Sequence, residues 1–255
     1  MASRVIVVMP ALNAEATLER TVKDIPEGVV DQIILVDDCS TDRTVEISRR
    51  LGLTTIELEK RSGYGGNQKR CYDEALEAGA DIVVMVHPDY QYDSKLLPHM
   101  IGFIQDGVCD VIFGSRVRTR REALGSGMPV YKYIANRLLT LVENLVLGIN
   151  LSECHTGYRA YRREVLERVP YHRNSDDFVF DSEFLVEVSA LRFRIADVPV
   201  PCRYFDEASQ IRLRASIRYG LGTLAVLGAY LLHRAGLRKD RRLVPSPPEH
   251  AGSSR

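Results

Sequence analysis

The sequence has no excess of charge of either sign, because 34 Lys and Arg residues balance 34 Asp and Glu residues among 255. Without a net charge there is no global attraction to nucleic acid or to an anionic membrane, so such a partner must meet a local patch. We therefore expect no nucleic-acid partner. Gly and Pro are near their average abundance, at 18 and 11 residues, which excludes a collagen-like or low-complexity chain.

Cysteine pairs are absent as well. The five cysteines are scattered along the chain, and no two stand at Cys-x-x-Cys spacing. This spacing argues against a zinc knuckle and a disulfide framework, and it favours reduced thiols in a cytosolic protein. The apolar segment Val5–Met9 is too short for the core of a signal peptide, so we expect a cytoplasmic location.

A long apolar run is missing near the C-terminus. The uncharged segment Tyr219–Leu232 has 14 residues, whereas a membrane-spanning helix needs about 20 apolar residues. The basic residues from Arg234 to Arg242 follow it directly and favour peripheral contact with the inner face of the plasma membrane. Core packing and homodimer formation remain the alternatives for this helix and for a helix expected at residues 130–149.

Short apolar segments alternate with helical segments over the first 115 residues. The apolar segments are continuous, which is typical of strands buried on both faces of a parallel sheet. The expected strands are residues 5–8, 33–36, 54–56, 82–86 and 111–113. The expected helices are residues 15–24, 41–51, 68–77 and 94–105. This alternation predicts an α/β fold with a doubly wound, mostly parallel sheet flanked by helices.

The second half of the chain is less regular. We expect a loop at residues 115–129, helices at 130–149, 181–191 and 211–233, a turn-rich segment at 166–177, and a strand at 195–200. Residues 236–255 are basic and then rich in Pro and Ser, which predicts a disordered tail after a single domain spanning residues 1–235.

Polar residues follow several of the expected strands, and the carboxyl ends of such strands form the ligand-binding edge of the sheet. Asp37 and Asp38 follow the second strand, where carboxylates could accept hydrogen bonds from a ribose or a base; a turn with a helix cap is the alternative. Asp89 follows the fourth strand and could bind Mg²⁺ or Mn²⁺, with diphosphate completing the shell; a surface turn is the alternative. The glycine-rich segment at residues 61–67 could bring its backbone close to a ligand.

These segments together resemble family 2 glycosyltransferases, in the branch of dolichyl- and polyprenyl-phosphate sugar synthases. The motifs that carry the resemblance are Pro-Ala-Leu-Asn-Ala-Glu at 10–15, Val-Asp-Asp-Cys-Ser-Thr-Asp at 36–42, the glycine-rich segment, Asp89 with Gln91, Gly-Ser-Arg at 114–116, and Cys-His-Thr-Gly-Tyr-Arg at 154–159. The resemblance covers residues 3–235 and implies a GT-A (Rossmann-like) fold with amphipathic helices near the C-terminus.

The resemblance also implies roles for individual residues. Donor-binding residues would be Pro10, Asn13, Glu15, Asp37, Asp38, Gly65 and Gln91. Asp89 would be the metal ligand, with Gln91 or His87 as a further candidate, and Arg116 would contact the diphosphate or the acceptor phosphate. Acceptor-side residues would be Thr156, Gly157, Tyr158, Arg159, Glu183 and Arg203, with Asp181 as the third catalytic residue beside Asp89 and Arg116.

Two positions depart from the family pattern. His87 stands where relatives often carry the first aspartate of an Asp-x-Asp motif, which leaves Asp89 as the principal metal ligand. Relatives that use polyprenyl phosphate often carry a Ser-Lys pair after an arginine, whereas Arg203 is followed here by Ser209-Gln210. Arg212 or Arg214 is the alternative source of that positive charge.

The function that the resemblance implies is transfer of a hexose from a UDP- or GDP-sugar, with inversion, to a polyprenyl-phosphate acceptor. A phosphate acceptor is already an anion and needs no base, whereas a hydroxyl acceptor would need one, for which Asp181 is placed. The alternatives are the same donor chemistry with a soluble or glycan hydroxyl acceptor, and a non-catalytic subunit that binds a nucleotide sugar.

Overall fold

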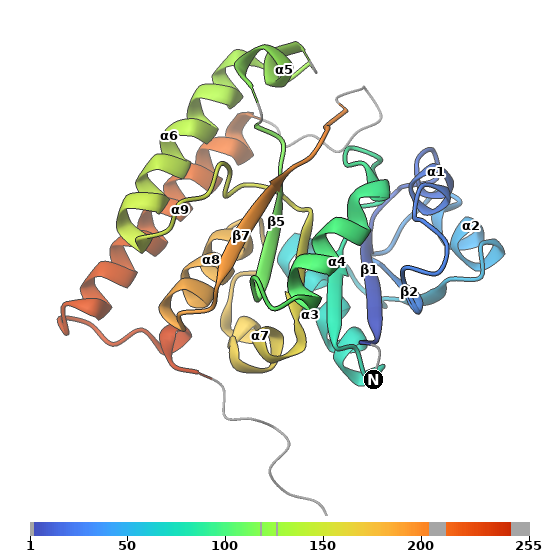
Figure 1. Cartoon of the computed structure of the whole chain (residues 1–255), viewed down its shortest axis with the longest axis horizontal. Helices are drawn as coiled ribbons and strands as arrows, with labels where there is room; N and C mark the ends of the chain where they lie inside the picture. The colour runs from blue at the N-terminus through green and yellow to red at the C-terminus, as the bar shows by residue number, and fades with distance from the viewer. Residues whose placement is uncertain (1–2, 118, 126, 204–212, 246–255) are drawn as a thin grey trace, which may run out of the picture.

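The computed structural model describes residues 3–117, 119–125, 127–203 and 213–245. This part of the chain forms one seven-stranded mixed sheet with helices on both faces (Figure 1). The strands are β1 Val5–Ala11, β2 Gln32–Asp37, β3 Thr54–Glu57, β4 Ile82–Met85, β5 Val111–Ser115, β6 Arg159–Arg162 and β7 Ile195–Pro199. Their spatial order is β3-β2-β1-β4-β6-β5-β7, and only β6 runs antiparallel to its neighbours.

The helices divide between the two faces of this sheet. The α-helices are α1 Leu18–Lys23, α2 Thr44–Arg50, α3 Gly63–Glu77, α4 Leu97–Gln105, α5 Arg120–Gly125, α6 Val130–Leu147, α7 Arg163–Arg168, α8 Phe180–Ala190 and α9 Leu213–Arg234. The 3₁₀ turns are η1 Ser94–Leu96, η2 Tyr171–Arg173 and η3 Arg241–Leu243. One core cluster joins the sheet to α3, α7 and α8, and a second joins it to α1, α2 and α4.

The central strands show why continuous apolar segments predicted the sheet correctly. Every residue of β1 is buried, and its side chains alternate between the two core clusters: Ile6 and Val8 lie in one, Val7 and Met9 in the other. Two buried faces leave no position for a polar side chain, so the alternation seen in half-exposed strands is absent. All six expected strands are confirmed.

Three local predictions were wrong. The expected helix at residues 68–77 begins earlier, at Gly63, because the glycine-rich segment forms the first turn of α3. The expected loop at 115–129 contains α5. The antiparallel strand β6 was missed because its sequence, Arg-Ala-Tyr-Arg, has no apolar run; the fold tolerates the buried charge of Arg159 because Asp181 pairs with it, at 3.3 Å.

The C-terminal segment also differs from its prediction. Residues 236–245 were expected to be disordered, but they fold back after α9 and include η3, where Arg242 forms an ion pair with Glu183 of α8. Residues 246–255 of the expected tail, and Ser209, Gln210 and Arg212 discussed above, lie outside the described residues.

Loss of the buried guanidinium of Arg159 is expected to destabilise the fold. Arg159→Met would leave the Asp181 carboxylate, which is 10% exposed, without its cation, and we expect a loss of about 3–5 kcal/mol in the free energy of unfolding. Denaturant titration measures it. The control is Lys23→Met, which removes an exposed (i, i+4) pair with Glu19 and should cost under about 1 kcal/mol. Equal, small losses in both variants would contradict the account.

Candidate active site

A cleft of about 480 Å³ opens at the carboxyl end of the central strands. Its floor comes from segments that follow β4 and β5 and from the turn before β6: His87, Asp89, Gln91, Arg116, His155 and Gly157. One wall comes from α3 and the start of α8, and the opposite wall comes from α6 and α9. The three expected catalytic residues therefore line one cavity: Asp89 and Arg116 from the ends of β4 and β5, and Asp181 from α8.

Asp89 lies in a tight turn after β4. Tyr90 adopts a left-handed backbone conformation, with φ of 57°, and Asp89 Oδ1 accepts a hydrogen bond from the Gln91 amide at 3.1 Å. Burial raises the pKa of the Asp89 carboxyl, and within the described part of the chain this carboxylate has no ion pair across the cleft. A cation is the group that would offset that burial.

His87 stacks on Tyr64, with ring centroids 5.6 Å apart, and packs directly on Gly157. A Cβ atom at position 157 would lie 2.4 Å from the imidazole, so the glycine of the Thr-Gly-Tyr-Arg motif is required by this contact. Burial lowers the pKa of His87, which keeps the ring neutral at pH 7 and able to accept or to ligate.

The cleft residues would hold a divalent cation only together with ligands from a bound substrate. No group of three or more His, Cys, Asp or Glu side chains is arranged to hold a metal among the described residues. Mg²⁺ needs only one or two carboxylates when phosphate oxygens complete its shell, so Asp89, with His87 or Gln91 beside it in the cleft, is sufficient in the presence of a diphosphate.

Asp181 faces the cleft from the first turn of α8 and is held by three donors. Tyr64 donates its hydroxyl to Oδ2 at 2.8 Å, Gln68 donates to Oδ1 at 3.3 Å, and Arg159 pairs with Oδ1 at 3.3 Å. Arg159 itself is fully buried beneath the cleft. The carboxylate is therefore fixed in orientation before any ligand binds.

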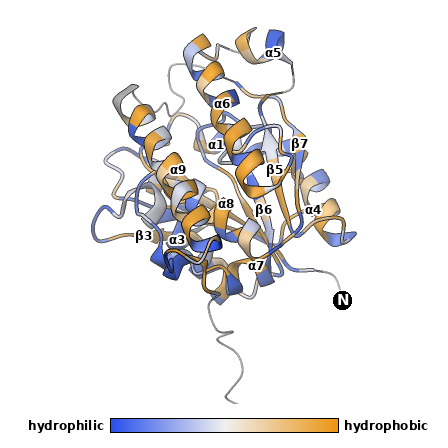
Figure 2. Cartoon of the chain, turned by 90° about the vertical axis from the view of Figure 1, so that its left-hand side faces the viewer, coloured by the Kyte–Doolittle hydropathy of each residue, from blue (hydrophilic) through white to orange (hydrophobic). Residues whose placement is uncertain are grey.

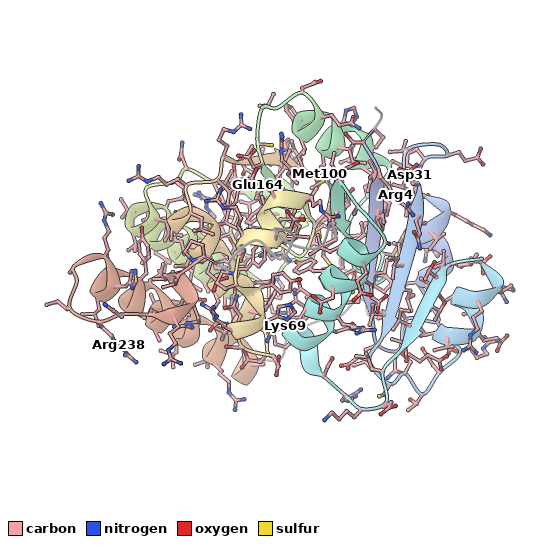
Figure 3. The ribbon with its side chains drawn as sticks, turned by 90° about the horizontal axis from the view of Figure 1, so that it is seen from below. Arg4, Asp31, Lys69, Met100, Glu164 and Arg238 are labelled. Carbon is pink, nitrogen blue, oxygen red and sulfur yellow. The ribbon has the colours of Figure 1, made fainter. Side chains whose placement is uncertain are left out.

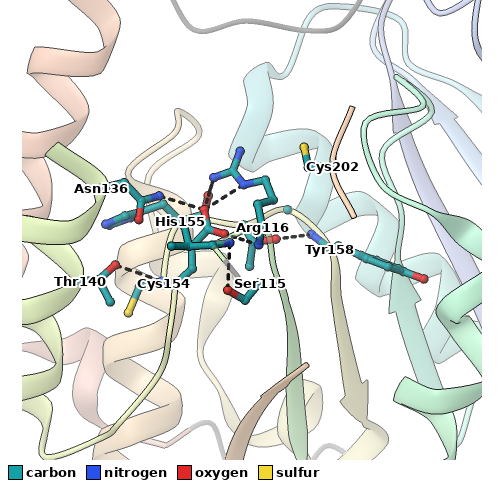
Figure 4. A network of polar contacts seen from close by, with 12 residues as sticks. Ser115, Arg116, Asn136, Thr140, Cys154, His155, Tyr158 and Cys202 are labelled. Atoms are coloured by element: carbon teal, nitrogen blue, oxygen red, sulfur yellow. Dashed lines mark hydrogen bonds and ion pairs between the residues drawn. The ribbon is translucent and has the colours of Figure 1, made fainter. Parts of the chain in front are cut away.

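Arg116 enters the cleft in a similarly fixed position (Figure 4). Glu153 is fully buried; it accepts from the backbone N–H of Arg116 at 2.6 Å and from its Nε at 2.8 Å. The His155 carbonyl accepts from the guanidinium, and Asn136 of α6 donates to Glu153 at 2.8 Å. The sequence analysis missed Glu153; its place two residues before His155 in the acceptor-side motif was the signal available.

The expected donor residues on the first two strands lie at the same edge but do not line this cleft. Asn13 accepts from the Thr41 amide at 2.8 Å, Glu15 from the Arg43 amide at 3.0 Å, and Asp37 from the Ser40 amide at 2.9 Å. Asp38 accepts from the Ser62 amide at 2.6 Å, and Pro10 is buried in β1. These contacts shape the loops beside the cleft, and contact with a donor stays a prediction.

Gly65 is also placed by packing. A Cβ atom there would lie 2.4 Å from the Ser175 carbonyl oxygen and 2.8 Å from Phe180, so this position has no room for a side chain. Gly65 does not line the cleft, and its contact with a donor stays a prediction.

Of the expected acceptor-side residues, only Gly157 lines the cleft. Thr156, Tyr158 and Arg159 are fully buried and support the turn from below. Glu183 points away from the cleft to Arg242, and Arg203 pairs with Asp93 at 3.4 Å and covers the Tyr90 ring. The charged groups of Arg159 and Glu183 are buried against Asp181 and Arg242, so neither lines the described cleft, and their contact with an acceptor stays a prediction.

Three cleft residues escaped the sequence analysis. Tyr64 and Phe178 pack with ring centroids 4.6 Å apart on one wall, and Lys132 of α6 lies on the other. Burial, and then the charge of Arg116, lowers the pKa of the Lys132 ammonium. The two cations therefore repel one another across the cleft, and an anion between them would relieve that repulsion.

Comparison with known proteins identifies the family. The model of the family described as glycosyl transferase family 2 matches residues 6–169. The dolichyl-phosphate hexose transferase of Haloferax volcanii is 30% identical over 210 residues, which cover 81% of this chain and 85% of that protein. A UDP-N-acetylglucosamine–dolichyl-phosphate N-acetylglucosaminyltransferase of Methanococcus voltae is 26% identical over 262 residues, which cover 96% of this chain and 100% of that protein.

A further relative is longer. The low-salt glycan biosynthesis hexosyltransferase Agl6 of H. volcanii is 31% identical over 199 residues, which cover 76% of this chain but 46% of Agl6, so the chain spans about half of that relative. In structure, glucosyl-3-phosphoglycerate synthase from Mycobacterium tuberculosis, solved in complex with uridine diphosphate, matches 97% of this chain and 91% of its own with a TM-score of 0.71 at 22% identity. That likeness shows a shared GT-A fold, and with the family match the chain belongs to glycosyl transferase family 2.

Proposed function

We propose that this protein transfers a hexose from a nucleotide sugar to a polyprenyl phosphate, with inversion at the anomeric carbon, at the inner face of the plasma membrane. The observation that carries the proposal is the continuity of the cleft: its floor holds Asp89 and Arg116, and its outer wall is apolar, from Leu139 of α6 to Leu221 and Leu224 of α9. A polyprenyl phosphate fits this cleft, because its charged headgroup matches the polar floor and its hydrocarbon chain matches the apolar wall. The names of the relatives from H. volcanii and M. voltae, which act on dolichyl phosphate, support the same acceptor class.

The outer faces of α6 and α9 support contact with a membrane. Exposed apolar residues recur at helical spacing on both helices, and Figure 2 shows hydrophobic residues along each. They are Ile134, Leu138, Leu141 and Leu145 on α6 and Ile217, Leu221, Leu224 and Leu231 on α9, of which Ile217, Leu221 and Leu224 also line the cleft. Apolar stripes that face solvent at this spacing are typical of helices lying in a membrane interface.

The apolar part of α9 is longer than the 14-residue uncharged segment Tyr219–Leu232 of the sequence. Residues Ala215–Arg234 are long and apolar enough to cross a membrane by length and composition, and only 17% of their most apolar window is buried. The inner sides of both helices nevertheless contact the body, since Thr140 and Glu143 of α6 and Thr223 of α9 are buried. An interfacial position, with the outer stripes in lipid and the inner sides on the protein, satisfies both observations.

Lys132 is placed to meet the acceptor phosphate where the apolar groove reaches the charged floor. It lines the cleft together with Arg116 and Asn136, and a phosphate bound there would lie between two cations and an amide. Lys132 would then supply the positive charge that relatives obtain from the lysine of the Ser-Lys pair, which this sequence lacks. The acceptor headgroup is thus held close to the anomeric carbon of a donor on the cleft floor.

In the reaction, an acceptor phosphate oxygen attacks the anomeric carbon as the bond to the nucleoside diphosphate breaks. Arg116, fixed by Glu153, stabilises the negative charge that gathers on the leaving diphosphate. A divalent cation bound at Asp89 would act as a Lewis acid toward the same oxygens. Asp181 is already engaged by Tyr64, Gln68 and Arg159, an arrangement suited to orienting a substrate hydroxyl; it would serve as base only for a hydroxyl acceptor.

Removal of the Asp89 carboxylate is expected to abolish metal-dependent turnover. Asp89→Asn should lower kcat by roughly 10²- to 10³-fold, because stabilisation of the leaving group is lost, while the fold is retained. The measurement is release of nucleoside diphosphate from a panel of UDP- and GDP-sugars with and without Mn²⁺. Asp106→Asn, at a residue outside the cleft, is the control. Activity of the Asp89 variant within twofold of the parent would remove the role assigned to this residue.

Loss of the Lys132 ammonium is expected to weaken acceptor binding selectively. Lys132→Ala should raise the KM for polyprenyl phosphate roughly 10- to 100-fold, as for loss of a charged hydrogen bond, with the donor KM within twofold and partial recovery in Lys132→Arg. Lys60→Ala, at an exposed lysine, is the control. Steady-state kinetics with each substrate varied measures this, and transfer to a hydroxyl acceptor without any lipid would favour the alternative acceptor class.

Charges on the outer stripes are expected to release the protein from membranes. Leu145 and Leu231 are 74% and 46% exposed and do not line the cleft, so the double variant Leu145→Glu/Leu231→Glu should fold normally yet co-sediment at least tenfold less with vesicles containing phosphatidylserine, since buried apolar area and charge drive such binding. Val108→Glu, at an exposed apolar residue outside these helices, is the control. Unchanged vesicle binding, with conversion of a dimer to a monomer in sedimentation velocity, would instead identify this face as a dimer interface.

A further inference from the structure

The segment that follows α9, residues 236–245, returns to the body of the protein and is termed here the C-terminal strap. Arg173 donates to the carbonyl oxygens of Arg241 and Val244, the latter at 3.2 Å. The Asp240 amide donates to His233 Nδ1 at 3.0 Å, and Arg242 pairs with Asp240 at 2.7 Å. The strap is thus held at several points, and it presents the Arg242 guanidinium to α8.

Glu183 of α8 is the partner of Arg242 and connects the strap to a second segment. One oxygen of this buried carboxylate pairs with Arg242, and the other accepts from the Ser175 amide at 2.6 Å. Glu187, one turn later, accepts from Asn174 at 2.9 Å, and burial raises its pKa to about 8. At pH 7 Glu187 is therefore mostly uncharged, and Glu183 is the anion that Arg242 compensates.

Residues 174–178 carry this connection to the first turn of α3. The Gly65 amide donates to the Asp176 carbonyl at 2.8 Å, and Lys69 pairs with the Asp176 carboxylate at 2.7 Å. The absence of a side chain at Gly65 allows the Ser175 carbonyl to approach. A displacement of residues 174–178 would therefore break or lengthen these contacts with the first turn of α3.

The same segment forms one wall of the cleft. Phe178 packs on Tyr64, both rings line the cavity, and Tyr64 donates to Asp181 at 2.8 Å. A continuous series of contacts thus runs from Arg242 through Glu183, residues 174–178 and Tyr64 to the carboxylate that faces the substrate. No member of this series other than Tyr64, Phe178 and Asp181 reaches the cleft itself.

We propose that Arg242 and Glu183 are positioning residues: their ion pair holds residues 174–178 against α3 and so fixes the Tyr64–Phe178 wall of the cleft. Without Arg242, the buried Glu183 carboxylate would be left without its cation beside Glu187 and would move toward solvent. That movement weakens its hold on the Ser175 amide. The expected effect of this ion pair on catalysis rests on the proposed function. Its expected effect on the position of residues 174–178 does not.

Hydrogen exchange of the substrate-free protein tests the structural part. In Arg242→Ala, the amides of Ser175 and Gly65 should exchange at least tenfold faster, while the amide of Val8 in β1 keeps its rate; Arg242→Lys should restore most of the protection. Arg238→Ala is the matched control, since Arg238 is exposed and projects outward at the end of the molecule (Figure 3). Unchanged exchange at both amides in Arg242→Ala, or equal acceleration at Val8, overturns the inference.

Kinetics test the link to the cleft. Arg242→Ala should raise the donor KM about tenfold with a change of less than threefold in kcat, and Arg242→Lys should recover the parent KM. Faster exchange with an unchanged donor KM would overturn the positioning role. A parent protein that turns over no nucleotide sugar would contradict the proposed function instead, and the exchange comparison would still decide whether the strap holds residues 174–178.

Discussion

Arg159 carries a full charge into the interior of the protein, directly beneath the cleft, and the arrangement of the site depends on how that charge is neutralised. Its guanidinium donates to the Thr156 carbonyl at 2.6 Å and to the Cys154 carbonyl at 3.3 Å, pairs with Asp181, and lies over the Phe113 ring. One buried cation thereby joins the turn before β6, the end of β5 and the start of α8. A buried ion pair adds little net stability, but this one fixes the orientation of Asp181 in the cleft.

Other polar residues of the cleft are held in place by their neighbours in the same way. Arg116 is oriented by the buried Glu153, and the imidazole of His87 is confined between Tyr64 and Gly157. Asp89 differs from Arg116, because its partly buried carboxylate has no ion pair among the described residues and its pKa is raised by desolvation. Preorganised groups of this kind need no rearrangement as charge develops on a leaving diphosphate, which is the condition for electrostatic catalysis. The outer wall, formed by α6 and α9, then adds an apolar path for an acceptor chain.

Strands that depend on interactions between residues close in sequence were predicted correctly, whereas elements that depend on pairs distant in sequence were not. Apolar segments such as residues 5–8 and 82–86 predicted their strands because burial on both faces is a local property of the sequence. The motif residues Asp89 and Arg116 met in one cleft because β4 and β5 end at one edge of the sheet, and Asp181 joins them from the first turn of α8. By contrast, β6 and the strap depend on pairs distant in sequence, Arg159 with Asp181 and Arg242 with Glu183. From their composition alone, arginine-rich segments of this kind are predicted as loops. Only the distant carboxylate that pairs with each arginine explains why they pack against the rest of the protein.

The central claim is that one cavity joins a diphosphate-binding floor to an apolar groove for a prenyl chain. The most direct measurement is the product formed when purified protein is incubated with a radiolabelled nucleotide hexose, Mn²⁺ and undecaprenyl phosphate in vesicles. The account predicts a label that extracts into organic solvent, identified by mass spectrometry as an undecaprenyl-phosphate hexose of inverted anomeric configuration. Label confined to water-soluble hexose or glycan, at donor turnover unaffected by the lipid, would contradict it.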